Sequence, residues 1–123
     1  SLGFTEALLR GIGCNWLVCL AVFAAAASTE TIGKIAALWF PTMAFVALGM
    51  EHCIANMFFI PLGILTGTDP RYIALVEAGK AAALKADFYS FAVGNLIPVT
   101  IGNIIGGSVL VGMLYLAANI KKT

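Results

Sequence analysis

Three long apolar segments, separated by short polar stretches, constrain this chain more than any other feature of its sequence. They cover about residues 8–27, 35–66 and 91–120. A helix needs roughly 20 apolar residues to cross a hydrocarbon layer about 30 Å thick. Of the 123 residues, 61% are hydrophobic and only 11% are charged. The pattern predicts an all-α membrane protein with three transmembrane helices, and residues 1–123 as part of a single domain.

The middle segment is too long for one straight span. Its length of about 32 residues would extend roughly 48 Å as a continuous helix at 1.5 Å per residue. Irregular backbone is tolerated at membrane depth only where protein or a water-filled cavity surrounds it. We therefore predict that the second helix is broken at mid-membrane, near residues 49–53. The residues able to interrupt it are Pro41, the stretch 49–52, Asn56, Pro61 and Gly63.

Glu51 and His52 lie next to each other inside this apolar segment. A charge at the bilayer centre costs about 2.5 to 3.5 kcal/mol, so such residues need partners and mark functional sites. Neighbouring helical residues point about 100° apart, so we expect one to line a path and the other to brace the break. We assign lining to His52, because imidazole both donates and accepts hydrogen bonds. The alternative is a buried histidine that only bonds a helix carbonyl.

Other polar and aromatic side chains could support such a site. Glu51 is expected to accept hydrogen bonds from backbone N–H groups freed at the break, or from the Asn103 amide. Asn15 lies near the centre of the first segment, where its amide either joins helices or points into a path. Phe45 precedes His52 by two helical turns, so its ring either narrows the path or faces lipid.

Three simpler expectations follow from the remaining pattern. Gly102 and Gly106 are spaced to let helix backbones approach closely in lipid. Residues 73–84 are rich in alanine with charges on one side, which predicts an interfacial helix. Because the chain begins with Ser1 rather than Met, we expect it to be a fragment of a longer protein.

Composition disfavours several classes of function. The formal net charge of +1 gives no basic field for nucleic acid. His52 is the only histidine, and the three cysteines show no CxxC spacing, so we expect no metal, haem or other cofactor. The cysteines are predicted to be small buried hydrophobic residues.

Three blocks of sequence resemble the formate/nitrite transporter family. They are C-N-W-L-V-C-L-A-V (14–22), G-M-E-H-C-I-A-N-M-F-F-I-P-L-G-I (49–64) and N-L-I-P-V-T-I-G-N-I-I-G-G (95–107), and they occur in the order found in that family. The resemblance covers almost the whole chain and matches helices four to six, the C-terminal half of an aquaporin-like bundle of six helices. It implies a multi-pass protein of the inner or plasma membrane that assembles as a homopentamer and is not an enzyme.

The resemblance also implies roles for individual residues. His52 corresponds to the pore histidine of the family, and Asn15 to its pore-lining asparagine on the fourth helix. Phe45 and Val18 correspond to constriction residues. The resemblance also strengthens the prediction that Glu51 and Asn103 support the interrupted segment.

The resulting hypothesis is passive or proton-coupled transport of a small monovalent anion, with formate as the first choice. In a narrow apolar passage the anion would meet His52, which hydrogen-bonds it and can pass it a proton, because desolvation disfavours both the carboxylate and the imidazolium. Nitrite, hydrosulfide, acetate and lactate are alternative substrates. A helical membrane scaffold without transport activity is the rival function, and the break in the second segment favours the pore.

Overall fold

All regular structure in the described part of the chain is helical. The computed structural model describes residues 2–74 and 87–120. We call residues 88–119 the long C-terminal helix, within which η1 and η2 are π-helical. The elements are α1 (Phe4–Ala27), α2 (Thr31–Ala47), α3 (Cys53–Thr66), α4 (Pro70–Ile73), α6 (Phe88–Phe91), η1 (Ala92–Leu96), α7 (Ile97–Ile104), η2 (Ile105–Met113) and α8 (Leu114–Asn119).

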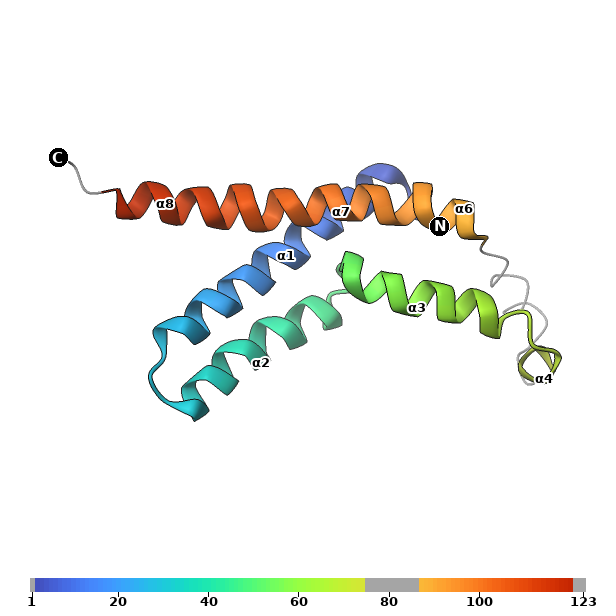
Figure 1. Ribbon diagram of the computed structural model, residues 1–123, viewed down its shortest axis with the longest axis horizontal. Coiled ribbons are helices and arrows are strands. Elements are labelled where there is room, and N and C mark those ends of the chain that lie inside the picture. The colour runs from blue at the N-terminus through green and yellow to red at the C-terminus, as the bar shows by residue number, and fades with distance from the viewer. Residues whose placement is uncertain (1, 75–86, 121–123) are drawn as a thin grey trace.

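The helices are arranged around one crossing point (Figure 1). Helix α1 crosses the long C-terminal helix at α7 and η2, and it forms an antiparallel hairpin with α2. Helix α3 leaves the end of α2 and lies along the α6 and η1 end of the long C-terminal helix. The junction of α2 and α3 therefore faces the point where α1 and α7 meet.

Helix lengths confirm the predicted pattern of two full spans and one broken span. Helix α1 has 24 residues and the long C-terminal helix has 32, and both are long and apolar enough to cross a membrane. Helices α2 and α3 have 17 and 14 residues. At 1.5 Å per residue they are roughly 26 and 21 Å long, so each is shorter than a hydrocarbon layer of about 30 Å. The predicted interfacial helix at 73–84 lies almost entirely outside the described residues.

The break occupies residues 48–52, and its local sequence explains where both helices end. Gly49 has φ of +63°, a left-handed conformation that glycine adopts without steric cost. The Gly49 N–H donates to Val46 O and the Met50 N–H to Phe45 O, each at 3.0 Å, which is the Schellman pattern of a helix end. Pro41 and Pro61 lie inside α2 and α3, so the expectation that they interrupt the segment was wrong.

Small residues allow α1 and α7 to touch through their backbones. A Cβ atom at Gly102 would collide with the Leu8 carbonyl oxygen, and one at Gly106 with the Ile12 carbonyl oxygen. In lipid, helices associate through such close contact rather than through the hydrophobic effect. The predicted role of the Gly102 and Gly106 pair in close packing is confirmed.

Asn103 joins three segments from the centre of this packing. Only 5% of the residue is exposed. Its Nδ2 donates to Gly11 O on α1 at 2.8 Å and to Glu51 O in the break at 3.0 Å. Its Oδ1 accepts from the Cys53 N–H, the first residue of α3, at 2.9 Å. One buried amide therefore uses both of its ends to hold α1, the break and α3 together.

Arg10 of α1 is a second residue whose side chain binds the break. Arg10 Nη1 donates to Gly49 O at 3.0 Å, and the Arg10 carbonyl accepts from the Glu51 N–H at 3.4 Å. The guanidinium also pairs with Glu6 at 2.6 Å. A cation at the C-terminal end of α2 is favourable, because the carbonyl groups there carry partial negative charge.

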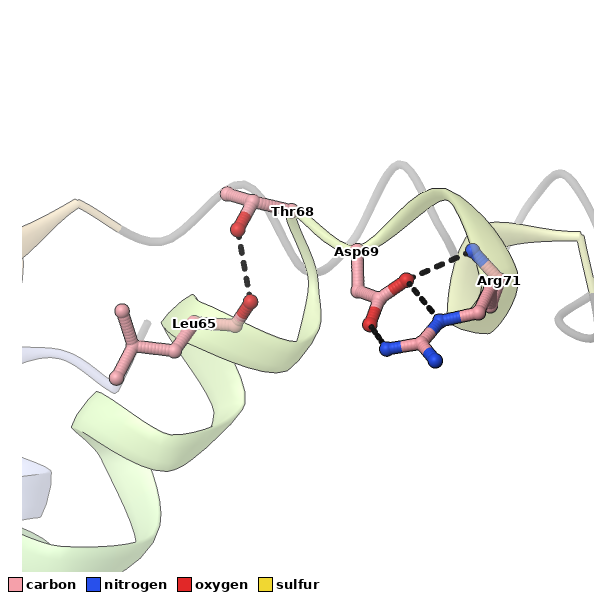
Figure 2. A network of polar contacts seen from close by, with 4 residues as sticks. All are labelled: Leu65, Thr68, Asp69 and Arg71. Carbon is pink, nitrogen blue, oxygen red and sulfur yellow. Dashed lines mark hydrogen bonds and ion pairs between the residues drawn. The ribbon is translucent and has the colours of Figure 1, made fainter.

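Polar caps close the helices at the opposite end of α3 (Figure 2). Thr68 Oγ1 donates to Leu65 O at 2.7 Å, and Asp69 Oδ1 accepts from the Arg71 N–H at 2.9 Å at the start of α4. The Arg71 guanidinium holds the pKa of the Asp69 carboxyl below its ordinary value. Asp87 caps the long C-terminal helix in the same way, and the Ser90 N–H lowers its pKa.

We predict that Gly106→Ala destabilises the full-length protein by about 2 kcal/mol, because the added methyl group must push the Ile12 carbonyl away. The measurement is the thermal unfolding midpoint of the detergent-solubilised protein. Gly63→Ala in α3 is the matched control, since a Cβ there meets nothing within 4 Å. Equal midpoints for the two variants would contradict the close contact between α1 and the long C-terminal helix.

We predict that Asn103→Ala costs about 3 kcal/mol, because it leaves buried backbone groups of three segments without their partner. Asn119→Ala is the control, as its Nδ2 makes one exposed bond to Tyr115 O. Thermal unfolding of both variants gives the comparison. A loss no larger than that of the control would refute the central role of Asn103.

Candidate functional site

His52 lies at the end of the break, where it is the N-cap of α3. Its Nδ1 accepts a hydrogen bond from the Ile54 N–H at 3.2 Å, and the ring is partly buried. A neutral imidazole that accepts at Nδ1 carries its hydrogen on Nε2. The cap therefore orients the ring with Nε2–H as a donor, beside a helix N-terminus whose partial positive charge attracts anions.

The break brings Phe45 against His52. Phe45 belongs to the last turn of α2, and the centroids of the two rings lie 5.9 Å apart at an interplanar angle of 36°. This contact disfavours the alternative in which the phenyl ring faces only lipid. Val18 lies partly buried on α1, and its place in a constriction stays a prediction.

Asn15 joins two helices. Its Nδ2 donates to the Asn103 carbonyl at 2.7 Å, which links α1 to α7 two residues before η2 begins. A Cβ atom at Gly107 would lie only 2.5 Å from the same Nδ2. Of the two interpretations open from sequence, the structure shows the helix-joining one, and the pore-lining role stays a prediction.

Glu51 differs from expectation in its partners. Its Oε2 accepts from Asn56 Nδ2 at 2.5 Å and from Asn95 Nδ2 at 3.1 Å. The Asn103 amide instead binds the Glu51 carbonyl, at 3.0 Å. The prediction that the carboxylate accepts from Asn103 was therefore wrong.

Three of the backbone N–H groups freed at the break already have other acceptors. The Met50 N–H donates to Phe45 O, and the Glu51 N–H donates to Arg10 O. The Cys53 N–H is taken by Asn103 Oδ1. The Glu51 carboxylate instead binds the side-chain amides of Asn56 on α3 and Asn95 on η1.

Asn56 and Asn95 are the polar residues that the sequence analysis did not assign to the site. Besides their bonds to Glu51, Asn56 Nδ2 donates to Asn95 Oδ1 at 2.8 Å, which closes a triangle of side chains. Both amides lie on apolar helices, and that is the signal that could have identified them. Residues 2–74 and 87–120 contain no group of three His, Cys, Asp or Glu side chains that could hold a metal ion.

The break brings together a donor ring, a phenyl ring and the positive end of a helix. The ring has a donor suited to a small anion, and the Glu51 carboxylate is hydrogen-bonded to two amides. Helix α2 also exposes large apolar side chains, including Trp39 and Phe40 at 64% each. Such a surface suits contact with lipid or with further helices.

Comparison with known proteins gives one consistent family. A family model described as formate/nitrite transporter matches residues 1–117. A probable formate transporter of Methanothermobacter thermautotrophicus is 47% identical over 122 residues, which is 99% of this chain and 38% of that protein. Formate channel FocB of Escherichia coli is 41% identical, over 97% of this chain and 43% of its own length.

A solved structure gives the same result. It is described as a pentameric formate channel with formate bound, and it is 40% identical with a TM-score of 0.83 over 98% of this chain and 48% of that one. This chain thus spans less than half the length of the relatives it matches. With a family model that covers nearly all of its residues, the chain belongs to the formate/nitrite transporter family.

Proposed function

We propose that this chain is the C-terminal half, helices four to six, of a membrane protein that transports a small monovalent anion, with formate as the first candidate. The observation that carries the proposal is His52 at the N-cap of a helix that restarts inside a broken span, in a chain 40% identical to a formate channel. Passage through a complete pore then requires the partner half, since this chain covers 48% of that channel.

Formate would be held by the Nε2–H of the neutral His52 ring. The bond from the Ile54 N–H to Nδ1 is the feature that selects this tautomer and orients the ring. A carboxylate loses solvation in a narrow apolar passage, and a charge-assisted hydrogen bond recovers part of that loss. Phe45 narrows the passage beside the ring, and Val18 and Asn15 are proposed to contribute from α1.

Proton coupling would use the same ring in a second form. Imidazolium carries hydrogen on both nitrogens, so protonation of Nδ1 breaks the bond from the Ile54 N–H. The Nε2 proton can then pass to the bound anion, which leaves the neutral ring with its hydrogen on Nδ1. An uncharged acid crosses an apolar constriction at lower energy than its anion. The N-cap bond would re-form once Nδ1 loses this hydrogen and Nε2 is protonated again.

The cellular setting follows the same likeness. We propose that the full-length protein is a homopentamer in the inner or plasma membrane and acts as a transporter rather than an enzyme. Support comes from the neighbouring structure, which is described as pentameric, and from the apolar helices, two of which are long enough to cross a membrane.

We predict that His52→Phe lowers formate flux at least about tenfold and removes its dependence on pH, since a phenyl ring offers neither donor nor proton. Uptake of labelled formate by proteoliposomes containing the full-length protein, followed across pH, is the measurement. His52→Asn is the matched variant, because asparagine is also a good N-cap and keeps the start of α3.

The two variants separate the roles of the ring. Loss of pH dependence in both, with the unfolding midpoint preserved in His52→Asn, is the expected result. Unchanged flux and pH dependence in His52→Phe would refute the proposed role of the imidazole. A panel of nitrite, hydrosulfide, acetate and lactate then ranks the substrates, and absence of flux for every anion would favour the scaffold.

A further inference from the structure

The triangle of Glu51, Asn56 and Asn95 lies beside the pore histidine but takes no part in the proposed contact with the anion. All three residues are partly buried. Both amides donate to the same carboxylate oxygen, Oε2, and Asn95 Oδ1 in turn accepts from Asn56. Asn95 thus both donates and accepts, and it is the member that comes from another helix.

The π-helical turn η1 explains how Asn95 reaches this position. Pro98 has no N–H to donate to the Gly94 carbonyl, and its ring crowds that carbonyl. The preceding turn widens instead, and the Ile97 N–H bonds to Ala92 O, five residues back. In a regular α-helix Asn95 and Asn103 would point about 80° apart after eight residues. A wider turn rotates the chain by a smaller angle per residue, which brings Asn95 closer to the helix face that carries Asn103.

The hydrogen-bond partners of the Glu51 carboxylate are neutral amides. Within residues 2–74 and 87–120, the ion pairs are Arg10 with Glu6 and Arg71 with Asp69, and neither includes Glu51. A partly buried carboxylate that accepts two N–H bonds is stabilised by them, and its position depends on them. Since Glu51 directly precedes His52, a displaced carboxylate would move the chain that presents the ring.

We propose that Asn95 is a positioning residue of the pore, which acts through Glu51 to hold the break in the geometry that presents His52. The proposal rests on the proposed function. It assigns the role to an interhelical contact, from η1 to the break, rather than to any contact between Asn95 and the permeating anion.

A pair of charge variants in the full-length protein tests this assignment. Asn95→Asp places a second carboxylate where an amide donated at 3.1 Å, and two like charges at that distance repel. We expect formate flux per folded protein to fall about tenfold or more. Glu51→Gln removes one charge and supplies an amide that can donate to the new aspartate. The double variant Glu51→Gln with Asn95→Asp should therefore return to within about twofold of Glu51→Gln alone.

The outcomes distinguish the possible roles. If Asn95 faces the anion directly, its aspartate repels formate whatever residue occupies position 51, and the absence of rescue overturns the proposal. Normal flux in Asn95→Asp would also overturn it. If Asn95→Asp lowers the unfolding midpoint but leaves the flux per folded protein unchanged, Asn95 serves stability alone, and the proposal is overturned. Rescue of both quantities supports positioning.

A control pair of substitutions tests whether the coupling is specific to positions 51 and 95. Glu30→Gln with Asn119→Asp repeats the same chemical changes at two exposed, separate sites, at the start of α2 and on α8. We expect no coupling between them. If the unaltered protein shows no formate flux, the proposed function fails, whereas coupling of the unfolding midpoints between positions 51 and 95 still shows whether the interhelical contact exists.

Discussion

Every backbone N–H and C=O group that a helix releases inside an apolar layer must find another partner, and the rest of this structure depends on that requirement. Residues 48–52 leave helical geometry in the middle of a long apolar segment. Gly49 ends α2 with a Schellman turn, and the ring of His52 caps α3. Between the two helices, Arg10 donates to Gly49 O, and Asn103 binds Glu51 O and the Cys53 N–H. Hydrogen bonds from several helices thus hold the break in place.

Close packing of α1 on the long C-terminal helix is the condition for this set. Asn103 reaches both Gly11 and the break only because Gly102 and Gly106 let the two backbones touch. The same crossing lets Asn15 bind the Asn103 carbonyl. Glycine contact and amide bonds therefore depend on each other, and loss of either would move the segment that carries His52.

As a result, the His52 ring is held by α3, which it caps, and by Phe45 of α2. Its Nδ1 is occupied by the start of α3, its neighbour Glu51 is held by α3 and η1, and its ring lies against Phe45 of α2. In a site built this way, the orientation of the neutral ring is set by protein groups and not by a ligand. Family membership and the likeness to a formate channel are consistent with this arrangement.

The sequence by itself determined the helical membrane class, the three apolar segments, the break near residues 49–53 and the close approach at Gly102 and Gly106, because each follows from hydropathy, length or residue size. Only the tertiary structure decided that Pro41 and Pro61 stay within helices, and that Glu51 pairs with Asn56 and Asn95 rather than with Asn103. Asn95 is 44 residues from Glu51 along the chain. Such a pair forms only where two helices cross with a defined rotation, and that rotation is set here by the π-helical turn and the packing of glycines, which no local pattern of residues specifies.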